Sequence, residues 1–98
     1  MKKLKIRFEN KSYTVKIREE KGRTAKKLKA WTDFDENNRW TKIVHVYKYL
    51  PKREKKHLIA HEIAEGISGI GSKMPAKKRH RKIAPLTRKI KEIIKNKI

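Results

Sequence analysis

Residues 57–65 carry three side chains that can bind a metal ion, spaced four positions apart. They are His57, His61 and Glu65 in the run HLIAHEIAE. On an α-helix, residues four apart share a face with their Cβ atoms about 6 Å apart, so a histidine can hold one ion together with a carboxylate or another histidine. Residues eight apart are separated by about 12 Å along the axis, so His57 and Glu65 cannot both join His61. The spacing favours a metal site on one helix face; the alternative is a solvated face of a charged helix.

Glu62 stands beside this row of ligands. It lies about 100° around the helix from His61, which is close enough to polarise a metal-bound water without ligating the metal. A metal ion with a carboxylate next to its bound water is an arrangement that activates water for hydrolysis. The residues around His61 therefore point to hydrolytic chemistry.

The same residues fit a known pattern. The run His61-Glu62-x-x-Glu65 is similar to the H-E-x-x-H helix of zinc peptidases, with Glu65 in place of the second histidine. Residues 30–65 resemble the central part of small zincin-like domains: Trp-Thr-Asp, a turn, the strand TKIVHVYKYL and a short basic run into the helix. Residues 80–86 (HRKIAPL) resemble the segment that returns a third ligand in small archaeal and phage-encoded relatives.

This resemblance implies a minimal zincin-like metallopeptidase in which His61, Glu65 and His80 hold zinc. Glu62 would be the general base, and the strand before the helix would form the sheet edge and bind an extended peptide substrate. Three protein ligands leave the fourth zinc position for water, whose pKa the metal lowers toward about 7. The oxyanion needs a second donor, and the candidates left open are Tyr47, Tyr49 and His45.

The charge of the chain supports a different hypothesis. Thirty Lys and Arg stand against ten Asp and Glu, a formal net charge of +20 at pH 7, which attracts polyanions such as nucleic acid. Residues 73–89 contain no acid, and their basic side chains are the candidate phosphate contacts: Lys73, Lys77, Lys78, Arg79, Arg81, Lys82, Arg88 and Lys89. In this alternative the chain is a small nucleic-acid-binding protein and HEIAE is coincidental. No recognised nucleic-acid motif accompanies the charge, and a solvated cationic face is an equal alternative.

Length and composition set limits on both hypotheses. A chain of 98 residues can bury one modest core, so we expect a single domain over residues 1–98. The absence of cysteine excludes disulfides, thiolate zinc sites and a cysteine nucleophile. No apolar run is long enough for a transmembrane helix. We expect a soluble protein of the cytoplasm.

The first half of the chain reads mainly as strands. Residues 3–9 and 13–18 alternate apolar and polar side chains, which predicts two half-buried strands joined by an Asn-Lys-Ser turn. Residues 24–33 fit a third strand or a short helix, and residues 40–50 are the most β-prone segment. We expect a small antiparallel sheet of three to four strands within residues 1–50.

Helices are expected to follow the sheet. Pro51 opens the predicted active-site helix of residues 51–71. In the basic segment 73–98, Pro75 is expected to start a second helix and Pro85 to start or kink a third. The first helix has an apolar stripe, formed by Ile59, Ile63, Ile67 and Ile70. Strands followed by two to three helices predict an α+β fold.

Overall fold

A four-stranded mixed sheet forms the base of the protein in a computed structural model that describes residues 2–69 and 76–97. The strands are β1 (Lys2–Phe8), β2 (Lys11–Glu20), β3 (Ala30–Phe34) and β4 (Trp40–Tyr47), in the order β1-β2-β4-β3. β1 pairs antiparallel with β2, as does β3 with β4, but β2 and β4 are parallel. The prediction of an antiparallel sheet is therefore wrong at its centre. Alternation of side chains fixes the face on which a residue lies, but not the partner or direction of its strand.

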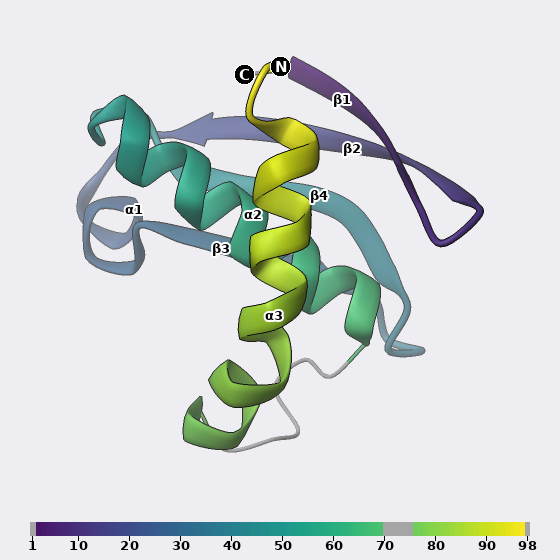
Figure 1. Cartoon of the computed structure of the whole chain (residues 1–98). Helices are drawn as coiled ribbons and strands as arrows, with labels where there is room; N and C mark the ends of the chain where they lie inside the picture. The colour runs from purple at the N-terminus through teal and green to yellow at the C-terminus, as the bar shows by residue number, and fades with distance from the viewer. Residues whose placement is uncertain (1, 70–75, 98) are drawn as a thin grey trace.

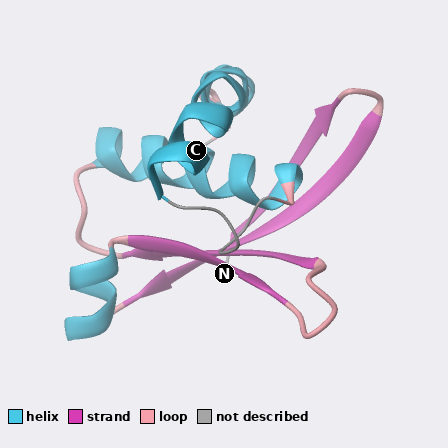
Figure 2. Cartoon of the chain, turned by 90° about the horizontal axis from the view of Figure 1, so that it is seen from below, coloured by secondary structure: helices cyan, strands magenta, loops and turns pink. Residues whose placement is uncertain are grey.

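Three helices complete the α+β fold, which confirms the predicted class. They are α1 (Arg23–Leu28), α2 (Lys52–Ser68) and α3 (Ala76–Ile94). α2 and α3 lie across each other on one side of the sheet (Figure 1), and α1 lies at one end on the other side (Figure 2). Segment 24–33 thus forms both a helix and a strand. α3 runs unbroken through Pro85, so no helix starts there, and Pro75 lies outside the described residues.

The β1–β2 hairpin turns at Glu9 and Asn10, one residue earlier than the predicted turn. Both residues have positive φ, 49° and 64°. Two central residues with positive φ form the tight turn whose twist matches that of the flanking strands. The hairpin is consequently in a fixed register, with Leu4 opposite Val15.

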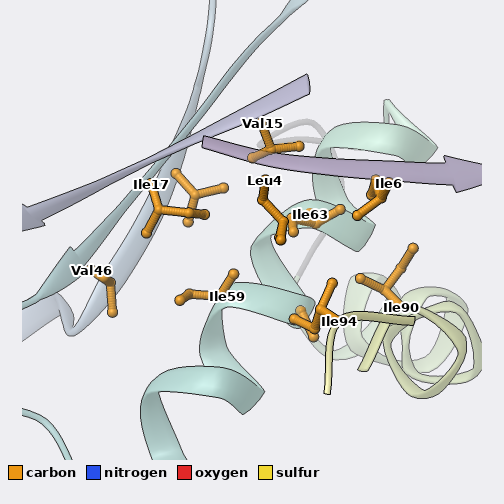
Figure 3. Packing of buried hydrophobic residues seen from close by; sticks show 11 residues of the cluster. Leu4, Ile6, Val15, Ile17, Val46, Ile59, Ile63, Ile90 and Ile94 are labelled. Atoms are coloured by element: carbon orange, nitrogen blue, oxygen red, sulfur yellow. The ribbon is translucent and has the colours of Figure 1, made fainter. Parts of the chain in front are cut away.

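The core lies between the sheet and the two long helices. Strand residues that point to the helices alternate with exposed ones, as the sequence predicts, and α2 and α3 each contribute an isoleucine stripe (Figure 3). The central members are Leu4, Ile6, Val15, Ile17, Val44, Val46, Ile59, Ile63, Ile90 and Ile94. Ile70 of the predicted α2 stripe lies outside the described residues. Within the described chain, no helix is both long and apolar enough to cross a membrane.

Trp40 fixes α2 against the β3–β4 end of the sheet. Its indole Nε1 donates a hydrogen bond to Thr32 Oγ1 at 2.7 Å, and that hydroxyl donates to the carbonyl of Ile43 at 2.6 Å. The indole lies directly against Gly66 of α2, where a Cβ atom would overlap the ring. The absence of a side chain at Gly66 therefore allows α2 to lie directly against the Trp40 indole at the start of β4.

Candidate metal-binding cleft

A cleft of about 990 Å³ lies between β3, α2 and α3. α2 contributes the predicted ligand row to one wall, and Asp33 of β3 and Arg88 of α3 are among the residues opposite. β3 is an outer strand of the sheet, whereas β4, the strand that directly precedes α2, is enclosed between β2 and β3. The strand implied by the resemblance as the substrate-binding edge is therefore the wrong one: β3 is the edge that borders the cleft. An edge strand offers unpaired backbone groups to an extended chain.

His61 and Glu65 come together on the cleft side of α2. His61 Nε2 and Glu65 Oε1 are 3.4 Å apart, with 21% and 13% of their side chains exposed. Zinc bonds of about 2.1 Å at a tetrahedral angle place two ligand atoms about 3.4 Å apart. An imidazole nitrogen and a carboxylate oxygen are also donors that zinc accepts. This pair thus fits the group that the resemblance implies, in both donor type and spacing.

Two polar side chains that are almost fully buried border the same cleft. Glu62 is 8% exposed and Thr87 is 5% exposed. Thr87 Oγ1 has no hydrogen-bond partner within the described part of the chain. Thr87 was not predicted from the sequence. It could have been noticed as a single hydroxyl residue in the apolar stripe of α3, between Ile83 and Ile90. Polar groups at this depth are surrounded by little water, so a hydrogen bond that they make to a molecule bound in the cleft is stronger than it would be in solvent.

His80, the implied third ligand, lies in α3, but its side chain is outside the described residues. Over residues 2–69 and 76–97, no three His, Asp or Glu side chains are grouped to hold one ion. Of the three predicted ligands, His61 and Glu65 are therefore the two whose side chains are described, and the role of His80 stays a prediction.

His57 lies one turn before His61 and also borders the cleft. Loss of hydration lowers the pKa of His57 below its ordinary value of 6.5, and the positive charge of Lys91 and the nearby His61 lower that pKa further. A lower pKa keeps the imidazole neutral near pH 7, which is the form that binds metals.

A second cluster of histidine and carboxylate lies on the sheet. His45 Nε2 is 2.7 Å from Asp33 Oδ2, and His45 Nδ1 is 3.2 Å from Glu20 Oε1. His45 is 9% exposed, and its ring stacks on that of Trp31, with centroids 4.8 Å apart. Both ring nitrogens therefore already face a carboxylate. Of the three residues considered as oxyanion donors, His45, Tyr47 and Tyr49, none borders the cleft, whereas Arg88 does.

The predicted phosphate contacts on α3 are exposed where their side chains are described. They are Lys78, Arg81, Lys82, Arg88 and Lys89. Lys73 and the side chains of Lys77 and Arg79 lie outside the described residues. α3 thus presents cations to solvent while its isoleucine stripe packs on the core.

Searches of protein-family models, curated proteins and solved structures gave no match to this chain. The residues of the cleft and the charged surfaces therefore carry the inference about function.

Proposed function

We propose that this protein is a zinc-dependent hydrolase of peptide bonds and that the cleft between β3 and α2 is its active site. The observation that carries the proposal is the 3.4 Å approach of His61 Nε2 and Glu65 Oε1 at the cleft wall, with the buried Glu62 beside them. In this proposal His61 and Glu65 are zinc ligands, and His80 is the third. When bound, zinc supplies a Lewis acid that makes a water molecule acidic enough to attack a peptide carbonyl.

The chain's own residues have three tasks in this reaction. Glu62, a carboxylate that borders the same cleft as His61 and Glu65, accepts the proton of the attacking water and passes it to the leaving amine. The Arg88 guanidinium donates hydrogen bonds to the carbonyl oxygen as its negative charge develops. The open edge of β3 pairs with the backbone of an extended peptide and holds it along the cleft.

Metal analysis of protein purified without a metal-affinity tag tests the site. We expect about one zinc per chain, lost in Glu65→Ala and in His61→Ala. His57→Ala is the matched control, since it removes a histidine one turn away on the same helix and should retain zinc. Absence of bound zinc under zinc-replete conditions, or equal zinc in all variants, would contradict the proposal. The cytoplasm is the location that we propose, because a chain without cysteine gains nothing from an oxidising compartment.

Nucleic-acid binding is the second candidate function. It is favoured by the exposure of the basic side chains of α3, named above, in a chain of net charge +20. Phosphate contacts make binding weaken steeply with salt. Fluorescence anisotropy of a labelled DNA duplex at several salt concentrations is the test, and an affinity that does not change with salt would refute this function.

A further inference from the structure

We propose that the outer face of the β1–β2 hairpin binds the phosphate backbone of double-stranded nucleic acid. This inference rests on the second candidate function and moves its principal surface from α3 to the sheet. The surface is the hairpin cation face, which we define as Lys3, Lys5 and Arg7 of β1 with Lys16 and Arg18 of β2.

The strand alternation places all five cations on one side. Lys3, Lys5 and Arg7 are exposed, and the buried Leu4 and Ile6 between them point to the helices. Lys16 and Arg18 follow the same rule in β2, around the buried Ile17. The long helices cover the opposite side, and α1 lies at the far end of the sheet (Figure 2). Within the described chain, no helix covers the hairpin cation face.

The charges of this face are not balanced within the protein. Lys3 lies directly opposite Lys16 in the strand register, and like charges in facing positions destabilise a sheet. Across the described residues, Arg18 has an acidic partner, Glu20 at 3.7 Å, but no carboxylate is within 4.0 Å of the other four cations. A bound polyanion would remove this repulsion, so the arrangement favours a ligand that carries several negative charges.

The shape and chemistry of the face favour a duplex backbone. Alternate residues of a strand are about 6.6 Å apart, so the row Lys3-Lys5-Arg7 is about 13 Å long. Along that length one strand of a duplex carries about four phosphates. The remaining outward positions of β2 are Ser12 and Thr14, which are exposed and polar, and Glu20, whose carboxylate contacts Arg18 and His45. The hairpin face offers no aromatic ring on which unpaired bases could stack and no apolar side chain to enter a membrane.

Two matched triple variants test the surface. Lys3→Gln/Lys5→Gln/Lys16→Gln removes three charges from the hairpin, and Arg81→Gln/Lys82→Gln/Lys89→Gln removes three from α3, so both have a net charge of +17 instead of +20. Anisotropy with a short labelled DNA duplex would be measured over a range of salt concentrations, and thermal melting would show that both variants fold. The slope of log K against log salt is negative for the wild-type protein. For the hairpin variant we expect it to be less steep by about 2.7, which is about 0.9 for each of the three lost contacts. That corresponds to a loss of roughly a hundredfold or more in affinity near 0.1 M salt. The α3 variant should remain close to wild type.

Each of the following results would overturn the inference. Equal weakening of both variants would mean that total charge, and no particular surface, attracts the duplex. A larger loss in the α3 variant would keep nucleic-acid binding and refute the hairpin surface. No binding by the wild-type protein would refute both. A hairpin variant that loses binding to phosphatidylserine vesicles but keeps duplex binding would identify a membrane partner instead.

Discussion

Two clusters of histidine and carboxylate in the described part of the chain are built in opposite ways. His61 and Glu65 are neighbours on one helix, and their donor atoms converge at 3.4 Å on the wall of a cleft. His45 collects its partners from two other strands, with Asp33 and Glu20 at opposite nitrogens of the ring and Trp31 stacked on its face. One ion cannot contact both edges of an imidazole, and only the doubly protonated ring donates to both carboxylates. The first geometry suits a shared ligand, whereas the second ties strands together.

The largest expected effect is on the rate of hydrolysis, which a functional cluster would control and a structural one would not. If Glu62 is the general base, Glu62→Gln should lower hydrolysis of a quenched fluorescent peptide library by about 10²–10⁴-fold, the usual contribution of proton transfer. Zinc content should be unchanged, because the amide leaves His61 and Glu65 in place. Activity equal to wild type in the zinc-loaded variant would show that the cleft cluster is as structural as the one on the sheet.

Gly66→Ala tests the close contact between α2 and the Trp40 indole. Alanine normally stabilises a helix relative to glycine by up to about 1 kcal/mol. Here the new Cβ meets the Trp40 indole, and overpacking of this kind costs about 1–3 kcal/mol. We expect a net loss of stability in urea denaturation. The same substitution in a Trp40→Ala background is the control, and an equal loss there would show that the indole is not the cause.

Replacing His45 or His61 with alanine compares how much each cluster contributes to the free energy of unfolding. His45→Ala should lower the free energy of unfolding by about 1–3 kcal/mol, because it leaves a cavity beside Trp31 and removes the hydrogen bonds of a buried ring to two partly exposed carboxylates. His61→Ala removes a side chain that is 21% exposed and lies 3.4 Å from Glu65 on the same helix. Contacts between partly exposed polar groups contribute little, so we expect a smaller loss, of about 1 kcal/mol or less. Urea denaturation of both variants at the same pH measures the difference. Equal losses would contradict the division between a structural and a functional cluster.

The contrast also explains which features could be predicted from the sequence. His61, Glu62 and Glu65 share one helix turn, so helical geometry alone places them together. The partners of His45 are 25 and 12 positions away in the chain, and their meeting depends on β4 entering between β2 and β3. Strand alternation predicts the buried face of each strand but not that order. For the same reason the edge strand that borders the cleft could not be identified before the topology was known, whereas the α+β class followed from local patterns.

The smallest expected effect concerns His57, at the cleft but outside the proposed ligand pair. Its pKa is below 6.5 through loss of hydration, Lys91 and His61, and an NMR titration of the ring should show this. Lys91→Gln should raise the pKa of His57. Lys89→Gln removes the same charge elsewhere on α3 and should leave that pKa unchanged, and equal shifts in the two variants would show that Lys91 is not a specific cause.

The lowered pKa of His57 also makes folding stability depend on pH. Below pH 6.5 the unfolded chain takes up a proton at His57 that the folded chain resists. Folding stability should therefore fall as the pH drops through 6.5 toward the folded pKa. His57→Gln should remove that part of the acid sensitivity and leave the contribution of every other group in place.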